Sequence, residues 1–96
     1  MYVRLVRFGF GPGKQDAAQR LAADLVPAIA DRPGCKGVTF FGDHSDGEYG
    51  LYVLWDSQDN ADAAASVIGP RLEQHLAGTV QRPPERRLFE VLESSA

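Results

Sequence analysis

The chain has 96 residues, 44% of them hydrophobic and 24% charged, and a formal net charge of -3 at pH 7. This length and composition suit one small globular domain over residues 1–96 and exclude a disordered or fibrous chain. The acidic balance without a basic block argues against nucleic-acid binding, and no apolar run reaches the roughly 20 residues of a membrane span.

The compartment follows from the N-terminus and the cysteine count. The first residues alternate apolar side chains with arginines and do not form a signal-peptide core. Cys35 is the only cysteine, which leaves no internal disulfide and suits a reducing compartment. We therefore expect a cytoplasmic protein in which Cys35 is a small buried apolar residue, with a frayed tail at residues 93–96.

The first half of the chain alternates strand and helix patterns. Residues 2–10 are rich in β-formers and stop at a glycine-proline-glycine turn, which predicts a strand. Residues 14–30 place apolar side chains at i, i+3, i+4 and i+7, which predicts an amphipathic helix. Pro27 should kink this helix or end it early, because proline lacks the backbone donor. A second strand is expected at residues 35–41.

The second half repeats the alternation. Residues 42–47 are dense in turn formers and predict a hairpin into a third strand at residues 48–56. Ser57 is a good N-cap for a second helix, which we expect to be interrupted at Gly69 and Pro70 and to stop near Gly78. A connector at residues 81–85 leads to the last strand, expected at residues 87–92, and the adjacent Arg86 and Arg87 are expected at its solvated or ion-paired start.

This order predicts an α+β, ferredoxin-like β-α-β-β-α-β fold with a four-stranded antiparallel sheet and two helices on one face. The strands are apolar on both faces, so the second face needs a cover. Four strands present roughly 400 Å² in projection, and about double with side-chain relief, near the ~800 Å² per partner of a standard interface. We therefore expect a homodimer that closes through the sheets.

Four segments carry a resemblance to a known family: RFGFGPGK at residues 7–14, RPGCKG at 32–37, LYVLWDS at 51–57 and PPERRLFEV at 83–91. In this order and spacing they resemble the antibiotic biosynthesis monooxygenase family of dimeric α/β-barrel proteins. The resemblance implies a homodimer with a pocket between the sheet and helices of each subunit. It also implies oxygenation of aromatic substrates such as anthrones or quinols without metal or flavin, although other members degrade haem.

The chain departs from the family at several positions. Ala64 stands where members often carry a histidine on the second helix, and Val6 stands where haem-degrading members use an asparagine. The tryptophan that those members place on the second helix is also missing, in a run of alanines. His75 lies near the position of their haem-ligating histidine. One match in three positions disfavours haem degradation.

Strand alternation, together with the pocket that the family resemblance implies, selects the first candidate site residues. Arg4, Val6 and Phe8 share one face of the first strand, which we expect to look toward the helices and the pocket. Arg4 either pairs with a carboxylate such as Glu90 or holds a substrate anion, and Val6 and Phe8 would contact the substrate. Trp55 is either a packing residue or a pocket wall whose indole N–H meets a substrate oxygen.

Two further candidates complete the expected site. His75 is either a residue of the helix edge or a general base, because imidazole accepts protons near neutral pH. Tyr52 is either an ordinary strand residue or a donor to a substrate phenolate. The catalytic candidates are therefore His75, Trp55 and Arg4, and the substrate-binding candidates are Tyr52, Val6 and Phe8.

Cofactors and metals are not expected. Turn chemistry alone explains the carboxylates and His44 at residues 43–48, and no phosphate-binding loop is present. Two functions stay open. One is a cofactor-independent monooxygenase for a small aromatic, quinol or polyketide-like substrate. The other is a non-catalytic ligand-binding or accessory dimer of the same fold.

Overall fold

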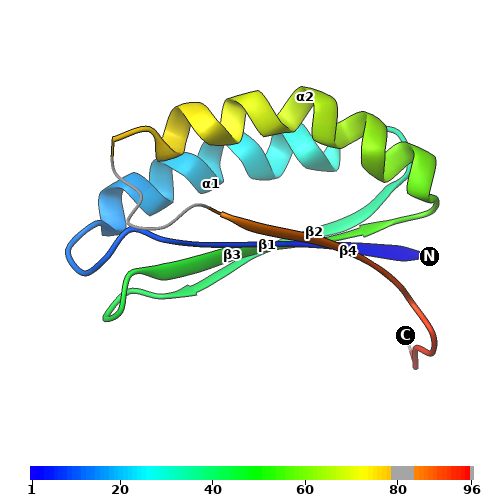
Figure 1. The fold of residues 1–96 in the computed structure, drawn as a ribbon, viewed down its shortest axis with the longest axis horizontal. Helices are drawn as coiled ribbons and strands as arrows, with labels where there is room; N and C mark the ends of the chain where they lie inside the picture. Colours follow the sequence, from blue (N-terminus) through cyan, green and yellow to red (C-terminus); the bar gives the residue numbers. More distant parts are fainter. Residues whose placement is uncertain (79–83, 96) are drawn as a thin grey trace.

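The computed structural model describes residues 1–78 and 84–95. The elements follow in the order β1 (Tyr2–Gly9), α1 (Gln15–Ala30), β2 (Cys35–Asp43), β3 (Glu48–Trp55), α2 (Gln58–Leu76) and β4 (Glu85–Glu90). The strands form one antiparallel sheet in the order β2-β3-β1-β4. Both helices lie side by side on one face of this sheet, and no element covers the other face within the described residues (Figure 1). The predicted fold class is confirmed.

Helix α1 packs on the sheet through a single stripe. Ala18, Leu21, Leu25 and Ile29 recur at helical spacing and are all buried. We predicted that Pro27 kinks this helix or ends it early; the early end is wrong, because α1 continues to Ala30 and the Asp31 N–H donates to the Pro27 carbonyl at 3.1 Å. The buried Ile29 side chain holds this last turn on the core, so packing overrides the local preference of proline.

Helix α2 begins as predicted, with the Ser57 hydroxyl accepting a hydrogen bond from the Asn60 N–H at 3.1 Å. The predicted interruption at Gly69 and Pro70 is wrong, because α2 runs unbroken to Leu76. Ile68 and Leu72 lie on either side of this pair and are both buried against the sheet. None of the helices within residues 1–78 and 84–95 has the length and apolarity that a membrane crossing needs.

Strand β4 begins and ends two residues earlier than predicted. Its pairing with β1 ends at Tyr2 opposite Glu90, and the Val91 N–H then donates to the Met1 carbonyl at 2.9 Å. Because β1 begins at Tyr2, no further backbone of β1 remains to pair with the residues after Val91. Leu92 is accordingly outside the strand and exposed. Residues 81–83 of the predicted connector lie outside the described residues.

The register of the sheet decides which side chains face the helices. Val6 pairs with Leu51 on β3 and with Arg86 on β4, and paired residues of antiparallel neighbours point to the same face. Val6 and Leu51 are buried under the helices, so Arg86 also starts from the helix-facing side. The register therefore brings an arginine of β4 under α2.

The opposite face of the sheet is apolar and open. We call this the free face. Its partly exposed aromatic side chains come from three strands, and Leu5 and Leu54 are half-buried beside them. The aromatic members are Phe41, Tyr52 and Phe89. Arg87 lies over the Phe89 ring, 4.6 Å from its centroid, and so covers part of this face.

Candidate functional site

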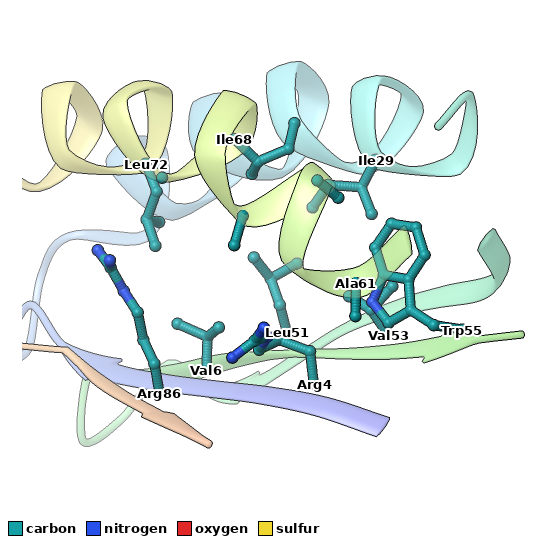
Figure 2. A pocket seen from close by; sticks show the side chains of 13 residues that line it. Arg4, Val6, Ile29, Leu51, Val53, Trp55, Ala61, Ile68, Leu72 and Arg86 are labelled. Atoms are coloured by element: carbon teal, nitrogen blue, oxygen red, sulfur yellow. The ribbon is translucent and has the colours of Figure 1, made fainter. Parts of the chain in front are cut away.

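A small cavity lies between the sheet and α2, with the last turn of α1 at one side (Figure 2). Its volume is about 70 Å³. Strands β1, β3 and β4 supply its floor, and α2 supplies most of its roof. The lining residues are Arg4, Val6, Ile29, Leu51, Val53, Trp55, Ala61, Ala64, Ala65, Ile68, Gly69, Leu72 and Arg86. Apart from the two arginines and Trp55, all of them carry apolar side chains or none.

The space exists because α2 presents small residues to the sheet. Ala61, Ala64, Ala65 and Gly69 follow the helical spacing that places them on one face of α2. Larger side chains there would fill the volume. The same run of alanines stands where the family resemblance led us to look for a histidine or tryptophan. Because α2 has neither a histidine nor a tryptophan at these positions, it contributes empty space to the cavity and no catalytic side chain.

Trp55 forms one end wall of the cavity. Its side chain is only 2% exposed, at the end of β3. The indole Nε1 is buried and has no hydrogen-bond partner among the described residues. Figure 2 shows the nitrogen-bearing edge of the ring on the side that faces Arg4. A buried donor without a partner costs free energy, and a ligand oxygen in the cavity would satisfy it.

Arg4 rises from β1 into the same cavity. Its Nη2 donates to Asp62 Oδ1 on α2 at 3.1 Å, while its Nε is buried without a partner among the described residues. Of the two alternatives predicted for Arg4, the structure shows an ion pair, with Asp62 in place of the suggested Glu90. Glu90 lies opposite Tyr2 in the sheet, two positions along β4 from the residue opposite Arg4. Arg4 therefore links the sheet to α2 and keeps one donor group free.

Arg86 is the site residue that the sequence analysis missed. Its Nη2 donates to Glu73 Oε1 on α2 at 3.3 Å, and its guanidinium passes beside Gly69 (Figure 2). The sequence analysis placed it at a solvated or ion-paired strand start. The signal that could have found it is its alternation with Leu88, which packs against the core. Two arginines thus face one small cavity.

His75 does not line the cavity. Its Nε2 lies 2.8 Å from Asp24 Oδ2 on α1, and Arg71 also pairs with Asp24. The hydrogen bond with His75 and the Arg71 guanidinium hold the pKa of Asp24 below its ordinary value. The structure therefore places His75 in a cluster that ties α1 to α2, away from Trp55 and Arg4.

Tyr52 and Phe8 also lie outside the cavity lining. Tyr52 is on the free face and 44% exposed, because it alternates with the buried Leu51 and Val53 along β3. Phe8 is buried in an aromatic cluster with Phe10 and Tyr49. Of the six predicted site residues, Arg4, Val6 and Trp55 come together around the cavity.

The acidic hairpin between β2 and β3 is held by local hydrogen bonds. Asp43 accepts bonds from the Ser45 hydroxyl and N–H, which lower the pKa of the Asp43 carboxyl. His44 Nδ1 lies 2.7 Å from the buried Tyr49 hydroxyl. Within the part of the chain that the structure describes, no group of three or more His, Cys, Asp or Glu side chains is placed to hold a metal ion.

A comparison of the sequence with models of known protein families shows which family the chain belongs to. The sequence model of the antibiotic biosynthesis monooxygenase family matches residues 1–66. The chain belongs to the antibiotic biosynthesis monooxygenase family. A comparison with curated proteins found no match.

Solved structures share the fold of this antibiotic biosynthesis monooxygenase family member. Rv0793 from Mycobacterium tuberculosis is similar with a TM-score of 0.77 at 17% identity, covering 99% of this chain and 98% of the other. A structure described as an antibiotic biosynthesis monooxygenase gives 0.81 at 18% identity, covering 97% and 100%. A single-residue mutant of MhuD gives 0.75 at 18% identity, covering 100% and 99%, and holds two manganese protoporphyrin IX per active site.

The porphyrin of the MhuD mutant invites a test of fit to this cavity. A volume of about 70 Å³ is about half of the ~150 Å³ that accommodates one benzene ring, and a porphyrin is several times larger than benzene. His75, the one histidine near the expected ligand position, bonds to Asp24 between the helices. The residues present do not fit a haem group.

Proposed function

We propose that the protein is a cofactor-independent monooxygenase that acts on a small aromatic or quinol-like molecule. The single observation that carries this proposal is the cavity in which Arg4 and the Trp55 indole N–H, which has no partner among residues 1–78 and 84–95, face apolar walls. Such a cavity shields the inner edge of a ring from water while offering cationic and hydrogen-bond donors to the oxygen on that edge. Family membership supports the reaction class, and fold alone would not.

The proposed role of Arg4 and Trp55 is to stabilise a substrate anion. A guanidinium in a largely apolar cavity favours the charged form of a phenol or hydroquinone and lowers its pKa. Donors fixed before the reaction also need no reorganisation when charge develops. We place no base in the lining, since no carboxylate or imidazole is among the described lining residues. The phenolic proton would therefore have to pass to water and not to a protein base.

The reaction balances without a cofactor. The ring anion gives electrons to oxygen, one oxygen atom enters the ring carbon, and the second leaves as water with two hydrogens of the substrate. A hydroquinone and O₂ thus give a hydroxyquinone and water. The protein contributes position and electrostatics, which are the two effects that the cavity offers.

Oxygen consumption tests this proposal. Purified protein is mixed with hydroquinone, substituted hydroquinones and anthrone under nitrogen, and oxygen uptake is followed after oxygen is admitted. We expect uptake faster than the uncatalysed background for a single-ring substrate, and a fall of at least tenfold in Arg4→Gln. Binding of a hydroquinone with uptake at the background rate would instead identify a non-catalytic ligand-binding protein of the same fold.

We also propose that the protein is a homodimer closed through the free face. Phe41, Tyr52 and Phe89 would otherwise stay exposed on one face of the sheet, and large exposed apolar areas mark interaction surfaces. Burying ~400 Å² of apolar surface at ~25 cal/mol per Å² contributes about 10 kcal/mol before the costs of association.

A further inference from the structure

Two arginines, Arg4 and Arg86, line the cavity, although one guanidinium would be enough to stabilise a substrate anion. Arg4 on β1 lies opposite Leu88, and Arg86 stands two residues before Leu88 on β4. Such diagonal neighbours on one sheet face are roughly 7–8 Å apart, within reach of long side chains. Both arginines line the cavity, and no acidic side chain is among its described lining residues.

The carboxylates that pair with these arginines lie outside the lining and are exposed. Asp62, the partner of Arg4, is 59% exposed, and Glu73, the partner of Arg86, is 69% exposed. Exposed ion pairs are weak because water screens both charges. A ligand anion at the cavity can therefore replace Glu73 as the partner of Arg86 at little cost.

The enclosed volume favours a ligand with a single ring at the inner end of the cavity. About 70 Å³ is half of the ~150 Å³ that holds a benzene, so part of a single ring has to extend into the mouth. The exposed residues of the lining, Ala65 and Arg86, mark that mouth. A substituent on the outward edge of the ring would thus meet Arg86, while the inner edge would meet Trp55.

We propose that the ligand is a single-ring phenol or hydroquinone that carries a carboxylate, and that Arg86 selects it. The carboxylate would bind the Arg86 guanidinium, and the ring hydroxyl would accept the Trp55 Nε1–H beside Arg4. A bidentate guanidinium–carboxylate contact is strong and geometrically specific. The inference rests on the proposed function for the kind of ring, and it adds the charged group and the residue that recognises it.

The sole tryptophan supplies a direct binding signal. In ¹⁵N-labelled protein under nitrogen, the Trp55 indole N–H gives a single resonance at the cavity wall. We titrate it with 2,5-dihydroxybenzoate and with the neutral 2,5-dihydroxybenzamide, which has the same shape. The acid should bind at least tenfold more tightly than the amide, and the two should shift the same resonance. Equal affinities for the acid and the amide would overturn the proposal.

Matched variants assign the preference to Arg86. Arg86→Gln should reduce the tenfold preference to less than threefold, whereas Arg20→Gln, which removes the same charge from the exposed side of α1, should retain it. A preference that survives Arg86→Gln would contradict the proposed role. The affinity of each variant for the amide shows whether the substitution has changed the shape of the cavity, because the amide binds there without the ion pair.

A second variant keeps the test open if Arg86→Gln fails to fold. Glu73→Gln frees Arg86 from its partner, so the acid should bind about threefold more tightly and the amide unchanged. Unchanged or weaker binding of the acid would count against the inference. Because every titration is anaerobic, the binding preference is independent of turnover. Uptake of oxygen without the preference would refute only this inference, and the preference without uptake would refute only the proposed function.

Discussion

At the residue scale, the two sides of strand β3 show what a sequence pattern can and cannot assign. Trp55 shares the buried face of β3 with Leu51 and Val53, whereas Tyr52, predicted as a substrate-binding candidate, lies on the opposite face. Nothing in the alternation tells a packed tryptophan from one that borders a cavity. That difference depends on the small residues of α2 across from it, and on a donor that finds no partner among the described residues.

The indole N–H of Trp55 should matter for activity and not for stability. Trp55→Phe keeps most of the buried ring and removes a donor that has no partner in the described part of the chain, so the free energy of unfolding should stay unchanged or rise by up to ~1 kcal/mol. Oxygen uptake should fall at least tenfold. Urea denaturation and an oxygen electrode measure the two effects.

Tyr49→Phe is the reciprocal control for Trp55→Phe. It removes a buried hydroxyl that is hydrogen-bonded to His44, outside the cavity lining. Stability should fall by about 1 kcal/mol while uptake is retained. If Trp55→Phe behaved like Tyr49→Phe, with lost stability and full activity, Trp55 would be a packing residue only.

At the element scale, the sequence predicted the number, type and order of elements, but it misjudged the end of β2, both ends of β4 and the continuity of α2. Pro27 and Pro70 were read by their local effect, and both lie inside helices whose neighbouring apolar side chains are buried against the sheet. The start of β4 was predicted two residues too late. Arg86 was therefore expected before the strand and not within it, where alternation would have assigned it to the helix-facing side. The start of β4 depends on its register with β1, which a single sequence does not show.

The empty space under α2 should be essential to function. Ala64→Leu adds a branched side chain to the cavity roof without breaking the helix, since leucine is a good helix former. Stability should change by less than ~1.5 kcal/mol or increase, while ligand binding and uptake are lost. Ala63→Leu, on the exposed side of the same turn, should leave both unchanged. Retained uptake in Ala64→Leu would place the reaction elsewhere.

The Asp24 cluster that ties α1 to α2 should make stability depend on pH in the acid range. The pKa of Asp24 is lowered in the folded protein, so its contribution is fully present above the unfolded value of about 3.9 and is lost as the pH falls through the folded value. Asp24→Asn should therefore be less stable than wild type at pH 6, and this difference should close toward pH 2. Urea midpoints across this range measure it. Glu93→Gln, which removes an exposed carboxylate after β4, should show no such closing gap.

At the scale of the whole molecule, the two faces of the sheet have different proposed roles. One face, with the helices, encloses the cavity, and the free face is the proposed dimer interface. The apolar residues on both faces of β3 were visible in the sequence and predicted the need for a second cover. The cavity could not be predicted from the sequence. It exists because the volume between α2 and the sheet exceeds the volume of the side chains that fill it, and a sequence does not show the first of these volumes.

Dimerisation is tested by charge placed on the free face. Wild-type protein should sediment at about twice the monomer mass of 10.4 kDa at micromolar concentration. Tyr52→Glu should shift the distribution toward monomer, because the carboxylate would be buried in the interface without a partner. Val67→Glu places the same charge on an exposed position of α2 and should leave the dimer intact. A wild-type protein that is monomeric at these concentrations contradicts the proposal.

The central claim, that the cavity under α2 hosts a monooxygenase reaction, is tested most directly with ¹⁸O₂. The hydroquinone that gives the fastest uptake is turned over under labelled oxygen, and the product is examined by mass spectrometry immediately after quenching. The proposed reaction predicts one ¹⁸O atom per product molecule in wild type and loss of labelled product in Ala64→Leu. Product that carries no label, or labelled product formed equally well by Ala64→Leu, would contradict it.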